Sequence, residues 1–112
     1  MPLVPSDGVG LCEELYEIYK SLSEGANFRN MVDDMSDLLM ENCMAGNRIP
    51  KDRVPEYYRK KYGVNNLYRY RLARGYRGIY TILRSRDKIQ VWILDLLNHD
   101  DYDRRFGYST SF

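Results

Sequence analysis

Residues 67–83 have the sequence LYRYRLARGYRGIYTIL, in which arginines and tyrosines alternate along two short runs. This pattern is typical of two β-strands joined by a tight turn at residues 73–75. Alternation places Arg69 and Arg71 on one face of the first strand. If the arginine-bearing faces of the two strands coincide, Arg77 joins them, and Arg74 lies in the turn. Such a cluster is costly to assemble without a polyanion, so the hairpin favours a polyanionic partner.

The composition predicts one folded domain spanning residues 1–112, because the apolar fraction of 44% is ordinary. No apolar run approaches the roughly 18 residues of a membrane span, and the N-terminus lacks the pattern of a signal peptide. We therefore expect a cytoplasmic protein with no membrane partner. Two cysteines and one histidine are too few for a disulfide framework or a structural zinc site. We expect reduced, buried thiols at Cys12 and Cys43, and neither a metal nor another cofactor.

The net charge of +1 hides a strong asymmetry between the two halves of the chain. Residues 1–50 contain three basic and nine acidic residues, a net charge of −6. Residues 51–112 contain fourteen basic and seven acidic residues, a net charge of +7. Such asymmetry is typical of a domain that binds nucleic acid through one half. The alternative is two surfaces of opposite sign that attract one another within the fold.

Outside residues 67–83, the periodicity predicts helices and one further strand. Apolar residues recur at helical spacing over residues 8–24 and again over residues 27–43, which predicts an antiparallel helical hairpin. Residues 56–62 predict two helical turns, residues 89–96 a buried strand and residues 102–106 a short final helix. We therefore expect an α+β fold with the helices on one side of a three-stranded antiparallel meander. Residues 1–6 add at most a brief edge strand.

Two polar residues stand out near the predicted final strand. His99 falls in an expected loop at residues 98–101, and its unperturbed pKa lies near neutral pH. Asp95 lies within the apolar run, and three arrangements remain open for it. It orients His99, it pairs with an arginine, or it lies at a strand end in solvent.

The chain resembles the RelE/ParE superfamily of bacterial and archaeal toxins in two motifs, Tyr68-Arg-Tyr-Arg-Leu72 and Gly75-Tyr-Arg-Gly-Ile-Tyr-Thr-Ile82. The order of two helices, a meander and a short final helix is also similar. In layout the likeness covers about residues 9–108, and it is motif-like over residues 67–83 and from Leu94 to Tyr102. In the RelE branch, the resemblance implies a ribosome-dependent ribonuclease that cleaves messenger RNA without a metal. It also implies a cognate antitoxin that wraps the toxin and silences it.

Carried over by position, the strand bases of RelE fall on Arg69 and Arg71, the motif arginine on Arg77 and the terminal tyrosine on Tyr102. Guanidinium binds phosphate oxygens bidentately, so Arg69 and Arg77 suit charge stabilisation. Arginine is effectively never deprotonated, so we assign proton transfer to His99 and Tyr102. The predicted catalytic residues are His99, Tyr102 and Arg77, and the predicted phosphate-binding residues are Arg69, Arg71, Arg74, Lys60 and Lys61.

The resemblance leaves a second function open, because the ParE branch implies gyrase inhibition on the same fold. A member without catalysis would bind only its partner. The nuclease hypothesis requires the arginines, His99 and Tyr102 to converge on one open surface.

Overall fold

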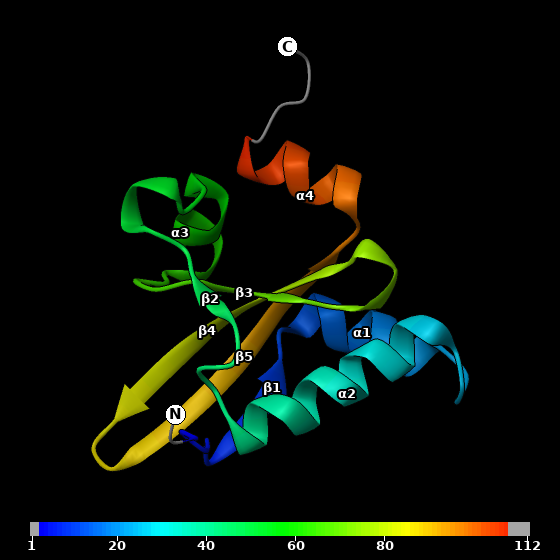
Figure 1. Cartoon of the computed structure of the whole chain (residues 1–112), viewed down its shortest axis with the longest axis horizontal. Helices are drawn as coiled ribbons and strands as arrows, with labels where there is room; N and C mark the ends of the chain where they lie inside the picture. Colours follow the sequence, from blue (N-terminus) through cyan, green and yellow to red (C-terminus); the bar gives the residue numbers. More distant parts are fainter. Residues whose placement is uncertain (1–2, 108–112) are drawn as a thin grey trace.

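The computed structural model describes residues 3–107, which contain four α-helices and five strands (Figure 1). Short 3-10 turns occur at Lys51–Arg53 and Ala73–Gly75. The helices and strands are, in chain order, β1 (Gly8–Leu11), α1 (Glu13–Ser21), α2 (Asn27–Glu41), β2 (Asn47–Arg48), α3 (Glu56–Tyr62), β3 (Tyr68–Arg71), β4 (Arg77–Ser85), β5 (Lys88–Leu97) and α4 (His99–Phe106).

The five strands form one mixed sheet in the order β1-β5-β4-β3-β2. Strands β3, β4 and β5 are the expected antiparallel meander. Strand β1 adds to it parallel to β5, and the two-residue β2 adds antiparallel to β3. The prediction of a three-stranded antiparallel sheet is therefore wrong in both strand number and strand direction, although the fold is α+β.

The N-terminal strand lies where the sequence predicts the start of a helix. Residues 8–11 read Gly-Val-Gly-Leu, and glycine destabilises a helix interior by roughly 1 kcal/mol relative to alanine. The alternation instead lets Val9 and Leu11 pack against the core while these residues pair with Gln90–Ile93 of β5. The first helix consequently begins at Glu13. No strand forms in residues 3–6, and residues 1–2 lie outside the described part of the chain.

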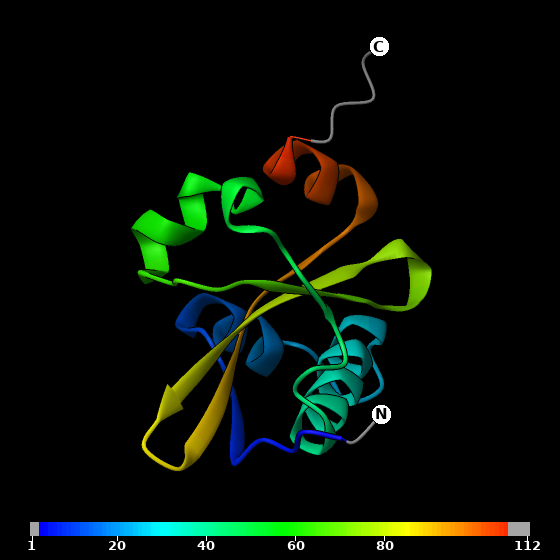
Figure 2. The same ribbon diagram turned by 60° about the vertical axis from the view of Figure 1, so that its left-hand side comes forward.

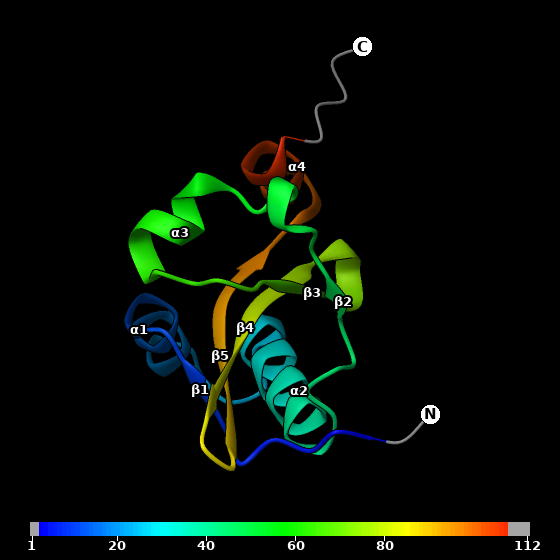
Figure 3. The same cartoon turned by 90° about the vertical axis from the view of Figure 1, so that its left-hand side faces the viewer.

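Helices cover both faces of the sheet, whereas the sequence predicted helices on one side only. On one face, Met35 of α2 lies so close to Gly78 of β4 that a side chain at Gly78 would overlap it. On the other face, Tyr58 of α3 donates a hydrogen bond to Asp95 of β5 (2.8 Å). Asp95 lies opposite Ile79 and therefore shares its face of the sheet. Gly78 precedes Ile79 in β4, and successive residues of a strand point to opposite faces, so Gly78 and Asp95 lie on different faces. Figures 1 and 3 show α3 and α4 together toward one end of the sheet, away from α2, and Figure 2 shows the same arrangement turned by 60°.

The buried core runs between α2 and the central strands. It includes Met35, Leu39, Tyr80 and Val91, each with no exposed surface. The buried Tyr80 hydroxyl donates to the Cys43 carbonyl and accepts from the Gly46 amide, which fixes the segment after α2 to β4. Cys12 and Cys43 are buried and unbridged, as expected. Within residues 3–107, no helix combines the length and the apolarity needed to cross a membrane.

Candidate nucleic-acid interface

The β3–β4 hairpin brings its arginines together as the alternation predicts. Arg71 lies directly opposite Arg77, and Arg69 lies opposite Ile79, so the three arginines share one face of the sheet. Directly opposed side chains on antiparallel strands have their Cβ atoms about 4.5–5.5 Å apart. Arg74 occupies the turn with a φ of +60°, in the left-handed region. We call Arg69, Arg71, Arg74 and Arg77 the arginine cluster.

Tyr102 of α4 packs onto the arginine cluster. Arg69 Nη1 donates a hydrogen bond of 3.0 Å to the Tyr102 hydroxyl. The guanidinium carbons of Arg69 and Arg77 lie 5.8 and 5.7 Å from the centre of the Tyr102 ring, and Phe106 stacks on that ring at 4.5 Å. The Tyr102 side chain is therefore almost fully buried, and only 3% of its surface is exposed. In this arrangement the tyrosine holds the two guanidinium groups in place.

The arginine cluster has no acidic counterpart among residues 3–107. None of its four members forms an ion pair with an aspartate or a glutamate in this part of the chain. The Arg77 guanidinium instead donates to the Gly75 carbonyl (2.8 Å), and Arg71 and Arg74 are exposed. Like charges placed directly opposite one another destabilise a sheet. An anion that binds all of them would remove this repulsion, so the geometry favours a ligand with several phosphates.

His99 lies in the first turn of α4 and not in the loop that the sequence predicts. The Asn98 side chain caps this helix by accepting a hydrogen bond from the Asp101 amide (2.8 Å), an N-cap signal that the sequence already contains. The His99 side chain is 61% exposed, and its Nε2 lies 3.2 Å from Asp103 Oδ2. Tyr102, which contacts the arginine cluster, lies one helical turn further along α4, whereas the contact that the structure gives for His99 is with Asp103.

The two lysines predicted to extend this site lie elsewhere. Lys61 of α3 forms an ion pair with Glu14 at the start of α1, which directly follows the edge strand β1. Strands β5 and β4 separate β1 from β3, which carries Arg69. Lys60 forms an exposed ion pair with Glu56 within α3 (3.3 Å). The structure therefore does not bring Lys60 and Lys61 together with the arginine cluster.

Sequence reasoning missed a partly buried polar network that joins α3, α4 and β5. Asp95 Oδ2 accepts hydrogen bonds from the Tyr58 hydroxyl (2.8 Å) and from Arg105 Nη1 (3.2 Å). Of the three arrangements considered for Asp95, the pairing with an arginine is the correct one. A carboxylate inside an apolar strand needs such a partner. Arg105 could be recognised only after α4 had been placed over β5.

This network ties α3 and α4 to the sheet. Burial raises the pKa of the Asp95 carboxyl, and the hydrogen bond from Tyr58 opposes that shift. Burial and the neighbouring Asp95 charge raise the pKa of the Tyr58 hydroxyl, which therefore stays protonated at neutral pH. The Arg105 guanidinium also lies 3.9 Å from the centre of the Tyr57 ring. Helix α4, which packs on the arginine cluster, and helix α3 are thus both held by one carboxylate of β5.

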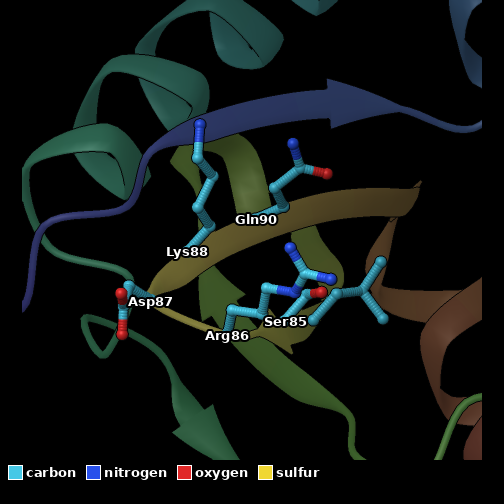
Figure 4. Close-up of a pocket in the computed structure, with 6 residues that line it drawn as sticks. Ser85, Arg86, Asp87, Lys88 and Gln90 are labelled. Atoms are coloured by element: carbon cyan, nitrogen blue, oxygen red, sulfur yellow. The ribbon is translucent and has the colours of Figure 1, made fainter.

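Two hollows in the surface lie outside the arginine cluster. One lies at the turn between β4 and β5, where Lys88 and Gln90 project from β5 in the same direction and Arg86 lies near Ser85 (Figure 4). The other lies between the start of α3 and the end of α4 and is lined by Tyr57 and Arg105 among others. No residue predicted from the sequence to bind RNA or to act in catalysis lines either hollow.

A metal centre finds no support in residues 3–107, where no three histidine, cysteine, aspartate or glutamate side chains lie close enough to hold an ion. Comparisons of the chain with models of protein families, with curated proteins and with solved structures found no match.

Proposed function

We propose that this chain is a RelE-like toxin that binds messenger RNA through the arginine cluster and cleaves it without a metal. The observation that carries the proposal is the set of four arginines on one hairpin with no acidic partner in the described residues. The two sequence motifs that resemble the RelE/ParE superfamily contain three of these arginines, Arg69, Arg71 and Arg77. The ribosome is the proposed place of action, and a cognate antitoxin is the proposed inhibitor.

The proposed reaction uses the RNA ribose as the nucleophile. The 2′ oxygen bonds to the adjacent phosphorus, its proton passes to neutral His99, and the bond from phosphorus to the 5′ oxygen breaks. The leaving 5′ oxygen is protonated from water, and the products are a 2′,3′-cyclic phosphate and a 5′ hydroxyl. Arg77 and Arg69 stabilise the negative charge that develops on the phosphorane. Tyr102, for which the sequence predicts proton transfer, is almost fully buried and has the different role of positioning both guanidinium groups.

A second candidate is a binding protein without nuclease activity, which acts on gyrase or only on its partner. Two features of α4 favour it. The His99 imidazole is engaged by Asp103, and Asp100 and Asp101 add negative charge to the same first turn. These carboxylates oppose the approach of a phosphate to His99. The two candidates share the arginine cluster and differ in whether His99 meets RNA.

Induced expression separates the two candidates. Growth and the 5′ ends of transcripts are followed for the wild type, for Arg77→Ala, for His99→Ala and for Lys60→Ala as a matched basic control outside the cluster. The nuclease predicts growth arrest with new transcript ends in the wild type and in Lys60→Ala, and loss of both in Arg77→Ala and His99→Ala. Growth arrest with intact transcripts would instead favour gyrase inhibition. Absence of arrest by the wild type would leave only partner binding.

A further inference from the structure

Strand β4 has an open edge beyond its pairing with β3. Strand β4 contains nine residues, but β3 pairs only with Arg77–Tyr80. Just beyond this pairing, the Asn66 side chain takes the place of a strand residue. Its Oδ1 accepts from the Ile82 amide and its Nδ2 donates to the Ile82 carbonyl, both at 2.9 Å.

Along β4 after Ile82, the next backbone amide and carbonyl that point toward the β3 side belong to Arg84. Successive residues of a strand direct their amide and carbonyl groups to alternate sides, so Arg84 follows Ile82. Ile89 of β5 lies opposite Arg84, but its backbone groups point away from β4. The Ile89 amide donates to the Asp7 carboxylate (2.6 Å), and the Ile89 carbonyl accepts from the Asp7 amide (2.7 Å). Among the described residues, the Arg84 backbone groups therefore meet no partner on the β3 side. An edge of this kind can accept an added strand.

A groove of about 410 Å³ runs along this edge. Its walls include Arg48 and Arg84, together with the exposed apolar side chains of Met44 and Leu83, which are 42% and 43% exposed. No acidic residue lines the groove, and neither arginine forms an ion pair within residues 3–107. The groove thus combines the backbone amide and carbonyl of Arg84, two positively charged side chains and two exposed apolar side chains.

We propose that this groove binds an extended, acidic segment of a partner protein, which adds to the sheet beside Arg84. The segment would exchange backbone hydrogen bonds with Arg84, place carboxylates against Arg48 and Arg84, and place apolar side chains against Met44 and Leu83. A second copy of this chain fits poorly, because pairing two such edges would bring the arginines of both copies within a strand spacing of about 5 Å. An RNA fits poorly too, because its backbone lacks the amide donor that pairs with the Arg84 carbonyl.

The groove beside Arg84 lies away from the turn that carries Arg74. Binding in the groove therefore does not depend on the proposed nuclease activity. Arg84 is near the opposite end of β4 from Arg77, which faces Arg71. A strand rises about 3.3 Å per residue, so these two ends are roughly 23 Å apart. A ligand of the groove and a ligand of the arginine cluster can therefore be distinguished by mutation.

The test uses the full chain, labelled with ¹⁵N, and a nine-residue peptide in which glutamate and valine alternate. Amide chemical shifts are followed during the titration. We expect saturable shifts at Arg84 and its neighbours, and slower hydrogen exchange of the Arg84 amide. A peptide of the same composition with its glutamates and valines in separate blocks should bind at least tenfold more weakly, as should a peptide with lysine in place of glutamate.

Variants separate the parts of the proposed contact. Arg84→Glu and Arg48→Glu should each lower the peptide affinity about tenfold or more, while Arg71→Glu, in the arginine cluster, should leave it within twofold. Arg84→Pro removes the outward amide, which an edge strand tolerates, and should bind more weakly than Arg84→Ala. The amide spectrum of each variant reports whether it is folded.

Three results would overturn the proposal. The first is equal binding of the alternating, block and lysine peptides. The second is a shift of the Arg84 amide by a ten-nucleotide single-stranded RNA but not by the acidic peptide. The third is concentration-dependent dimerisation of the peptide-free chain that Arg84→Glu abolishes, because it would assign the edge to a second copy.

Discussion

Removing one arginine of the cluster should change how RNA binding depends on salt. Each phosphate contact with single-stranded nucleic acid contributes about −0.7 to the slope of the logarithm of the binding constant against the logarithm of salt concentration. The four unpaired arginines therefore predict a slope of about −2.8 for the wild type. Between 50 and 200 mM KCl, this slope lowers the affinity about 50-fold.

The perturbation is Arg71→Ala, because Arg71 is exposed and lies opposite Arg77, whereas Arg69 and Arg77 themselves contact Tyr102. We expect the slope to become shallower by about 0.7, with no change in the preference among RNA sequences. The assay is fluorescence anisotropy of a labelled twelve-nucleotide RNA at several KCl concentrations. Lys60→Ala, which removes a cation already paired with Glu56, is the matched control and should leave the slope unchanged.

Two outcomes would refute the reasoning. If Arg71→Ala lowers the affinity equally at every salt concentration, Arg71 does not contact a phosphate. If Lys60→Ala changes the slope as much as Arg71→Ala does, RNA binds by general attraction to the basic half of the chain and not at the arginine cluster.

Three further predictions concern the structure around the site. Tyr80→Phe leaves two backbone groups without their hydroxyl partner and should lower the free energy of unfolding by about 2–4 kcal/mol, measured as a lower urea midpoint with an unchanged m-value. Gly46→Ala should cost about 1–3 kcal/mol in the same assay, since its Cβ would lie 2.6 Å from the Arg69 carbonyl oxygen; a neutral effect would show that this contact relaxes freely. Burial raises the pKa of Asp95, so the folded state holds its proton to higher pH than the unfolded state does. The protonated carboxyl therefore contributes stability at pH 4 that is lost as the pH rises through its folded-state pKa. The unfolding free energy of the wild type minus that of Asp95→Asn should fall between pH 4 and pH 7. A difference that rises over this range contradicts the assignment.

The arginine cluster was predictable because it depends on local alternation. In a short hairpin, the turn fixes which residues face one another, and residues 73–75 place Arg71 opposite Arg77. The pattern of apolar residues likewise predicts β5, α2 and α3 close to their observed bounds. These elements are long or are marked by proline and glycine, so their local signals agree with the fold.

The remaining strands depend on contacts that no local window contains. Strand β1 has four residues, two of them glycine, and its partner β5 lies some 80 positions further along the chain. Strand β2 has only two residues and is a strand because β3 lies beside it. The partnership of Asp95 with Tyr58 and Arg105 likewise joins three separate elements. Such pairings follow from the tertiary fold and carry no signal of their own.

The parallel pairing of β1 with β5 has a consequence for how the chain folds. The sheet can close only after the last strand has been synthesised, because β5 separates β1 from the rest of the meander. Contacts of such long sequence separation slow folding, since the ends of a long loop must meet before the contact contributes stability. A nascent chain that ends before residue 88 should therefore leave β1 without the strand with which it pairs, and the part of the core that β5 supplies would be missing beneath α2. The arginine cluster would acquire Tyr102 only when α4 emerges, so a truncated product would lack an ordered site.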